Sequence, residues 1–180
     1  MTKGRSERDQ RVYEQIEKAY STWSSGIFRF AMRLCGNRED AEDVVVETFT
    51  QAYRCWDKFV DTGSRRDWLY GIALNCIRTN RRRWKNRVEQ LVEETPAPQS
   101  NNLNLIVLYE EIAKLPLLQR QAVLLVKGEG VTCREAAEIL GRPLGTILYE
   151  VHRAMQTMRA AMTSESGDLE HASRLCEAEL

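Results

Sequence analysis

Apolar residues recur at helical spacing along almost the whole chain, and runs typical of β-strands are nearly absent. The first such run covers residues 12 to 35 and includes Ile16, Trp23, Ile27 and Phe30. Side chains three and four positions apart lie on one face of an α-helix, so each run predicts a helix with one buried side. Apolar residues make up 43 % of the 180, which is enough for packed cores. The sequence therefore predicts an all-α fold.

Helix start and stop signals divide the first part of the chain into three helices. Gly36 ends the first run, and Asn37 is a suitable N-cap for a helix over 38–57. Ser64, with an acidic residue three positions later, forms a variant of the capping box ahead of a helix over 65–87. These three helices are expected to pack as one domain.

Composition changes after the third helix. The stretch "VEQLVEETPAPQSNNLN" is polar and holds two of the four prolines, as expected of a flexible linker. We therefore expect two small helical domains, 10–87 and 105–163, joined by a linker over 88–104. The acidic tail over 164–180 is expected to be a frayed end.

The second domain contains a predicted helix-turn-helix. Thr132 can cap a first helix, and Gly141 can adopt the left-handed conformation that ends it. Pro143 suits the first turn of the next helix. The buried stripe of that helix is expected to comprise Ile147, Val151, Ala154 and Met158. Two short helices around a glycine-containing turn place the second helix in a DNA major groove.

Candidate DNA contacts lie on the outward face of this second helix. Arg153 could pair with guanine or a phosphate, and Thr146, Tyr149 and His152 could contact or stack on bases. His152 could equally be an exposed polar residue with no DNA contact. Candidate phosphate anchors, which position a domain without reading sequence, are Arg120, Thr132 and Arg134.

Charge is segregated by helix, although the formal net charge is zero. Acidic residues dominate the helix over 38–57, whereas the helix over 65–87 is basic and ends in "NRRRWKNR". Like charges so close together repel, so the cluster indicates an anionic partner. Basic groups beside an aromatic ring (here Trp84) are typical of single-strand nucleic-acid binding. Solvated helix faces or attraction to a membrane surface are the alternatives.

Several classes of protein are disfavoured. The five cysteines are scattered without a C-x-x-C pair, and two isolated histidines do not complete a zinc site, so buried free thiols are expected. Cys176 is interpreted as an incidental thiol. No glycine-rich phosphate loop or Cys–His pair is present, so we predict no enzyme, catalytic residue, metal or cofactor. No apolar run approaches the ~20 residues needed to span a bilayer, so membrane insertion is not expected. The N-terminal residues lack the apolar stretch of a secretory signal, so a cytoplasmic location is expected.

Four stretches together are similar to one family. "DAEDVVVETFTQAYRCWDKF", "RDWLYGIALNCIRTNRRR", "LPLLQRQAVLLV" and "REAAEILGRPLGTI" resemble, in this order, the extracytoplasmic-function (ECF) class of bacterial sigma-70-type RNA polymerase sigma factors. The resemblance implies sigma region 2 over 10–87 and sigma region 4 over 105–163. It also implies that the chain bridges core RNA polymerase and promoter DNA, and that a cognate anti-sigma factor controls it.

The resemblance also implies roles for individual residues. Those expected to dock on the β′ clamp helices are Asp40, Asp43, Glu47 and Gln51. Those expected to capture and follow the melted minus-ten strand are Phe59, Asp61, Arg65, Asn75, Arg78, Arg82 and Arg83. Those expected to read the minus-35 duplex are Thr146, Leu148, Tyr149, His152 and Arg153, with neighbouring helices on the β flap.

The chain departs from the family pattern mainly in the recognition helix. Leu148 and Tyr149 stand where a basic residue and serine are usual, and Glu150 replaces another basic residue. A distinctive minus-35 sequence, or a weak contact there, is therefore expected. The other departures are Val46, Gly71 and Thr79. Two alternatives remain open, a helix-turn-helix regulator of polymerase and an interaction protein with weakened DNA binding.

Overall fold

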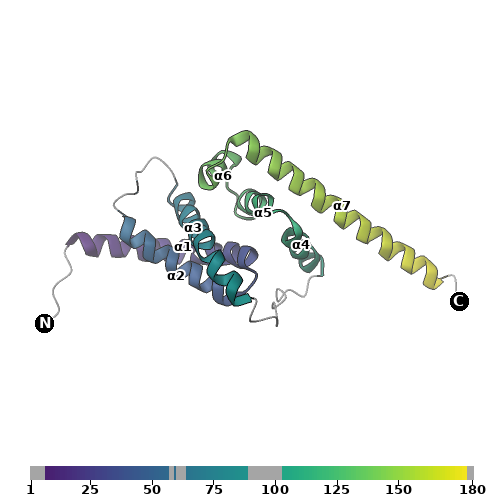
Figure 1. Ribbon diagram of the computed structural model, residues 1–180, viewed down its shortest axis with the longest axis horizontal. Helices are drawn as coiled ribbons and strands as arrows, with labels where there is room; N and C mark the ends of the chain where they lie inside the picture. The colour runs from purple at the N-terminus through teal and green to yellow at the C-terminus, as the bar shows by residue number, and fades with distance from the viewer. Residues whose placement is uncertain (1–6, 57–58, 60–63, 89–102, 178–180) are drawn as a thin grey trace.

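The computed structural model describes residues 7–56, 59, 64–88 and 103–177, and within them it contains helices and no strand (Figure 1). The predicted all-α fold is confirmed. Most of the predicted linker, residues 89–102, lies outside the described residues, as does Asp61.

The first three helices pack against one another and are called the first domain below. They are α1 (Glu7–Cys35), α2 (Arg38–Cys55) and α3 (Arg65–Val88). Their buried side chains include Ile27, Phe30, Val44 and Leu69. The ring of Phe30 meets that of Tyr70 edge-on, with the ring centroids 5.3 Å apart. The helical spacing in the sequence thus correctly located the inward faces.

Local signals set the ends of these helices. Gly36 has a φ of +83°, and its N–H donates to the Met32 carbonyl at 2.9 Å, which ends α1 as predicted. Asn37 caps α2, because its side-chain oxygen accepts from the Asp40 N–H at 2.8 Å. The first turn of α3 closes when the Trp68 N–H donates to the Ser64 carbonyl at 3.1 Å.

The remaining helices form the second domain. They are α4 (Leu103–Lys114), α5 (Leu117–Val123), a π-helical turn η2 (Leu124–Gly128), α6 (Cys133–Leu140) and α7 (Leu144–Glu177). Figure 1 shows α4, α5 and α6 beside the N-terminal half of α7, while its other half extends away. The stripe predicted for α7 is buried, at Ile147, Val151, Ala154 and Met158.

The predicted helix-turn-helix is present. Gly141 adopts the left-handed conformation at a φ of +62°, and the Arg142 N–H donates to the Ala137 carbonyl at 2.9 Å. The Gly141 N–H also donates to the Glu138 carbonyl at 3.2 Å, and together the two bonds end α6 at the predicted residue. Pro143 immediately precedes α7, where its carbonyl accepts from the N–H groups of Thr146 and Ile147. Pro143 therefore lies just before the first turn of α7 rather than inside it.

The end of α7 differs from the prediction. The helix continues to Glu177, through most of the acidic tail that was expected to fray. Residues 164–177 contain no proline, and half of them are glutamate, leucine, alanine or arginine, which favour helix. A polar composition was therefore a poor guide to where this helix stops.

Removing the cap of α6 should destabilise the second domain. The Thr132 hydroxyl accepts from the Glu135 N–H at 3.3 Å, and the Glu135 carboxylate accepts from the Thr132 N–H at 2.8 Å. Thr132→Ala is therefore expected to lower the free energy of unfolding by about 0.5–2 kcal/mol, measured by urea denaturation. Thr157→Ala, an exposed position inside α7, is the control and should cost nothing.

This cap should also depend on pH. The hydrogen bonds from Thr132, its backbone N–H first, lower the pKa of Glu135. A lowered pKa contributes stability above the ordinary pKa of glutamate, and this contribution is lost as the pH falls through the lowered value. An equal cost of Thr132→Ala at neutral pH and below the ordinary glutamate pKa would contradict this reciprocal cap.

Candidate nucleic-acid interface

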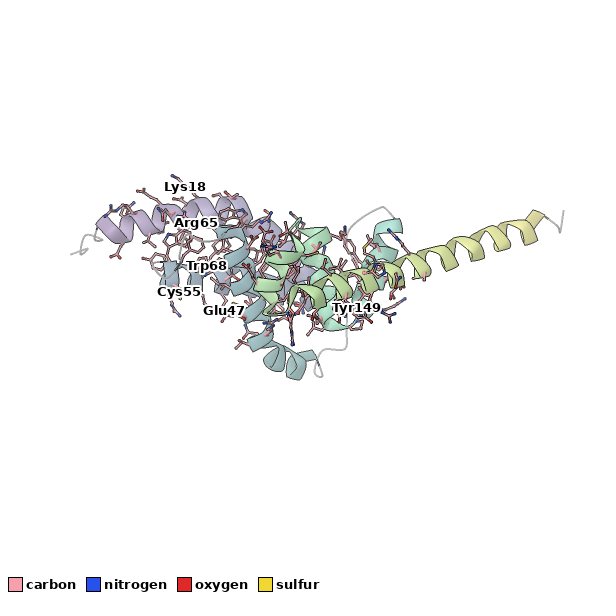
Figure 2. All side chains as sticks on the ribbon, turned by 90° about the horizontal axis from the view of Figure 1, so that it is seen from above. Lys18, Glu47, Cys55, Arg65, Trp68 and Tyr149 are labelled. Carbon is pink, nitrogen blue, oxygen red and sulfur yellow. The ribbon has the colours of Figure 1, made fainter. Side chains whose placement is uncertain are left out.

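An aromatic cluster surrounds the start of α3. The Trp68 ring lies 5.2 Å from the Phe59 ring and 5.8 Å from the Trp56 ring, centroid to centroid. The Arg65 guanidinium lies 5.2 Å from the centroid of Trp56 and 5.7 Å from that of Phe59. Figure 2 shows Arg65 and Trp68 near each other in the first domain. The cluster holds the Arg65 guanidinium next to the half-buried ring of Phe59.

Asn75 lies further along the same helix face. It is exposed and follows Trp68 by seven residues, which is close to two turns and about 10.5 Å along the axis. Phe59 contacts Trp68, so an aromatic ring and an exposed amide share one side of α3. A ring for stacking and an amide for hydrogen bonding are what an unstacked base requires.

The basic end of α3 is only partly described. Arg78 is exposed, and its Nη2 lies 3.4 Å from the Leu140 carbonyl of α6. Arg82 and Arg83 belong to the same continuous helix, but their side chains lie outside the described residues.

The acidic helix α2 does not present all of its carboxylates outward. Asp40 is only 4 % exposed and accepts from the Asn37 side-chain amide at 2.7 Å, so it stabilises the start of α2. Glu47 is half-buried and accepts from Asn80 of α3 at 2.6 Å and from Gln51 at 3.3 Å. The Asn37–Asp40 spacing was a signal for the first contact, whereas nothing local indicated the Glu47–Asn80 bond.

The recognition helix presents its predicted residues to the outside. Leu148 is 52 % exposed and Tyr149 58 %. His152 and Arg153 are also exposed, and Thr146 is half-buried. Figure 2 locates Tyr149 on α7. The outward face of α7 therefore combines apolar, aromatic and basic groups at its start.

The predicted phosphate anchors separate into two kinds. Thr132 and Arg134 are exposed at the start of α6, beside the turn. Arg120 instead donates through Nη2 to the carbonyls of Ala113 and Leu115, at 3.2 Å in the second case. Its guanidinium holds the end of α4, and its role as a phosphate anchor stays a prediction.

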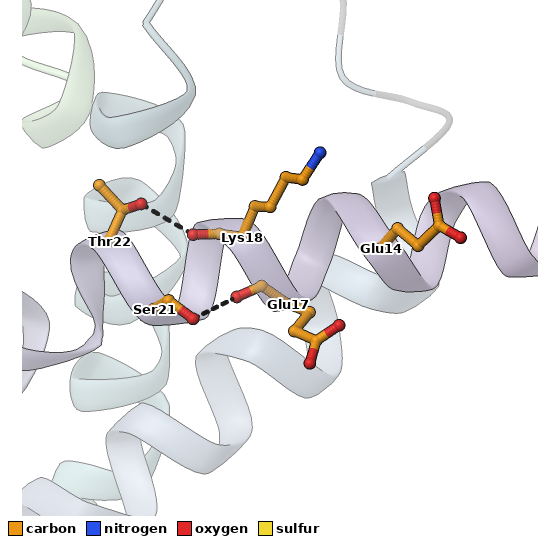
Figure 3. A pocket seen from close by; sticks show the side chains of 5 residues that line it. All are labelled: Glu14, Glu17, Lys18, Ser21 and Thr22. Atoms are coloured by element: carbon orange, nitrogen blue, oxygen red, sulfur yellow. Dashed lines mark hydrogen bonds between the residues drawn. The ribbon is translucent and has the colours of Figure 1, made fainter.

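Two hollows on the described part of the surface do not bring reactive groups together. The hollow in Figure 3, of about 460 Å³, is lined by five side chains of α1 alone. There the Ser21 and Thr22 hydroxyls donate to the carbonyls of Glu17 and Lys18. A second hollow of about 520 Å³ lies at the helix-turn-helix, between Arg134 and Leu144.

The described cysteines are free thiols. Burial raises the pKa of Cys35 to about 12 and that of Cys76 to about 11, so both are protonated at neutral pH. Among the described residues, no group of His, Cys, Asp and Glu side chains could hold a metal ion. No helix within the described ranges is long and apolar enough to cross a membrane.

Comparison with known proteins identifies both halves of the chain. Residues 19–87 match the family model "Sigma-70 region 2", and residues 105–158 match "Sigma-70, region 4". The chain is 31 % identical to the ECF RNA polymerase sigma factor EcfG of Rhodopseudomonas palustris, over 74 % of this chain and 77 % of that protein. It is 29 % identical to the ECF sigma factor SigE of Mycolicibacterium smegmatis, over 89 % of this chain and 66 % of that protein.

Two solved structures share the fold. The sigma factor RpoE of Bartonella quintana, in complex with the anti-sigma factor NepR, has a TM-score of 0.73 and 24 % identity, covering 83 % of this chain and 98 % of that chain. CnrH, in complex with the cytosolic domain of CnrY, has a TM-score of 0.66 and 23 % identity, covering 87 % and 95 %. Both matched regions, in their order, and the identity to EcfG show that this chain belongs to the ECF class of sigma-70-family RNA polymerase sigma factors.

Proposed function

We propose that this chain binds core RNA polymerase and directs transcription initiation at specific promoters. The observation that carries the proposal is the presence, in one chain, of an aromatic ring and an exposed amide on one side of α3 and of an exposed outward face on helix α7. One face suits a single strand and the other a duplex, which is the combination that promoter opening requires. The chain itself performs no covalent chemistry.

The first domain holds the minus-ten element after melting. Separating a duplex costs about 1.4 kcal/mol per base-pair step, so the opened strand must be bound to stay open. Phe59 and Asn75 supply a stacking surface and an amide for a flipped base. The family resemblance assigns Asp61 a part in capturing the same base. Arg78, Arg82 and Arg83 neutralise the following phosphates.

The second domain reads the minus-35 element through the major groove. Leu148 and Tyr149 give the start of α7 an apolar surface, which suits contact with thymine methyl groups. Arg153 pairs with guanine or a phosphate, while Arg134 and Thr132 position the domain on the DNA backbone. This mixed surface is the reason to expect a distinctive minus-35 sequence.

Polymerase contacts are assigned to α2 and to the helices around the helix-turn-helix. Asp43 is exposed, and Gln51 and Glu47 are half-buried beside it, so this strip faces the β′ clamp helices. Val46, 64 % exposed, adds an apolar contact at its centre. Asp40 contributes indirectly, by holding the start of α2. The helices near α6 rest on the β flap.

An anti-sigma factor is the proposed regulator. The similar sigma factor RpoE was solved with the anti-sigma factor NepR, which supports a partner of the same kind here. The proposed location is the cytoplasm, where polymerase and promoter DNA are found.

Run-off transcription with purified core polymerase tests the proposed function. A sigma factor makes core enzyme initiate at a defined start without any other factor. A regulator would act only on a polymerase that already carries a sigma factor, and an interaction protein would change nothing. Failure of the chain to associate with core polymerase would overturn the proposal.

Arg153→Ala should weaken minus-35 binding. Loss of one good base or phosphate contact costs about 1–3 kcal/mol, so footprint protection at minus-35 should require roughly tenfold or more additional protein. Gln156→Ala, also exposed on α7, is the matched control. Equal protection by wild type and Arg153→Ala would remove this residue from the interface.

A further inference from the structure

The two domains meet at a buried carboxylate. Glu129, which follows η2 in the second domain, has a side chain only 6 % exposed. Its Oε2 accepts from the Tyr70 hydroxyl of α3 at 2.7 Å, and its Oε1 lies 3.6 Å from Nη1 of Arg33 in α1. An acidic group of one domain is thus held by a phenol and a guanidinium of the other.

The receiving surface leaves just enough room for this contact. A Cβ at Gly26 of α1 would lie 2.7 Å from the Tyr70 hydroxyl oxygen and 3.4 Å from Oε2 of Glu129. The Tyr70 ring cannot easily move aside, because it is buried against Phe30. Any side chain larger than glycine at position 26 would therefore disturb the bond between Tyr70 and Glu129.

Further contacts surround this point. Arg33 also donates to the Tyr109 hydroxyl of α4 at 3.3 Å, and its guanidinium lies over the Tyr109 ring at 5.3 Å. Further along α3, near its middle, Arg78 reaches the Leu140 carbonyl of α6. Figure 1 shows α6 beside α3, in agreement with their packing. The proposed minus-ten helix therefore packs against the first helix of the helix-turn-helix.

We propose that Glu129, Arg33 and Tyr70 form a latch that holds the free chain in a closed state unable to bind both promoter elements at once. This inference rests on the proposed function. The centres of the minus-ten and minus-35 elements are about 25 base pairs, or roughly 85 Å, apart at 3.4 Å per base pair. Helices α3 and α6 touch in the closed state, so the two reading surfaces cannot span that distance until the domains separate.

The chemistry of the latch suits reversible opening. A buried ion pair is only slightly more stable than the same two groups separated in water, because the cost of desolvation offsets most of the attraction. Opening returns Glu129 and Arg33 to water, so binding to polymerase and DNA can readily outweigh the contact. Burial, together with the bond to Glu129, raises the pKa of Tyr70, so this phenol remains a donor across the physiological range.

Small-angle X-ray scattering of the full chain without partners tests whether the latch closes it. We expect a compact wild type, and larger radii of gyration for Gly26→Ala, Glu129→Gln and Tyr70→Phe. Loss of a hydrogen bond to a charged group should shift the closed-to-open ratio by about tenfold. Gly26→Ala is informative because alanine favours helix more than glycine, so α1 itself should not weaken. Glu110→Gln, an exposed α4 position, controls for charge.

Run-off transcription with core polymerase then tests whether closure inhibits. The apparent affinity of a chain falls with the fraction that is open, so the three latch variants should reach half-maximal transcription at lower concentration than wild type and Glu110→Gln. Variants as compact as wild type would overturn the latch. Expanded variants with an unchanged midpoint would overturn its inhibitory role. If no chain supports transcription, the proposed function fails while the scattering result still decides the latch.

Discussion

Phe30→Ala is expected to lower the free energy of unfolding of the first domain by about 3–5 kcal/mol. Phe30 is 0 % exposed and is the largest fully buried side chain among the described residues. It lies on α1 and packs edge-on against Tyr70 of α3, so truncation leaves a cavity between two helices. Domains are commonly stable by only about 5–15 kcal/mol, so a large part of the stability should be lost.

Chemical denaturation followed by circular dichroism measures this loss. Phe28→Ala, at a half-buried position on the same helix, is the matched control and should cost clearly less. Because Tyr70 loses its neighbour, Phe30→Ala should also loosen the bond to Glu129 and expand the free chain. A cost similar to that of Phe28→Ala would show that the site collapses around the smaller side chain.

The features predicted correctly from the sequence depend on neighbours in the chain. Gly36 and Gly141 end helices through their own backbone conformation, and Asn37 and Thr132 cap helices through bonds to residues three positions away. The buried stripe of α7 follows from helical spacing alone. Local geometry decides such features before the helices pack.

The features that sequence reasoning missed depend on distant partners. Glu47 was expected only on an outer, polymerase-facing surface, but it bonds to Asn80, thirty-three positions later in the chain. Nothing local indicated that the Arg120 guanidinium holds the end of α4. The bond between Tyr70 and Glu129 joins residues in different domains. The sequence shows which side chains are charged but does not show which of them are exposed. A charged side chain can find an internal partner once the helices have packed.

The proposed strand-binding site is the clearest case of a partial prediction. Its aromatic and basic composition could be read directly from the residues. The position of the Arg65 guanidinium near both Trp56 and Phe59 could not, because it depends on the packing of Phe59 and Trp56 against Trp68. Sequence thus indicated the chemistry of this face, and the fold supplied its geometry.

Replacing Arg78, Arg82 and Arg83 together by glutamine should weaken binding of the melted minus-ten strand by on the order of fifty-fold at 0.15 M salt. Each phosphate contact with a single strand contributes about 0.7 to the slope of log affinity against log salt concentration, so three lost contacts should lower the slope by about 2. The measurement is binding of a single-stranded minus-ten oligonucleotide to the complex with core polymerase, at several salt concentrations. The proposed latch predicts that the domains separate in that complex, so loss of the contact between Arg78 and Leu140 should not affect the result.

The control for this prediction removes the same charge elsewhere. Lys18, Arg54 and Lys127 are exposed on other elements, and their joint replacement by glutamine should leave the salt slope almost unchanged. Unfolding cannot explain the expected loss, because removing like charges from the end of α3 relieves repulsion within the helix. A slope equal to that of wild type would mean that the basic end of α3 does not follow the opened strand. The charge of this helix would then need another anionic partner to explain it.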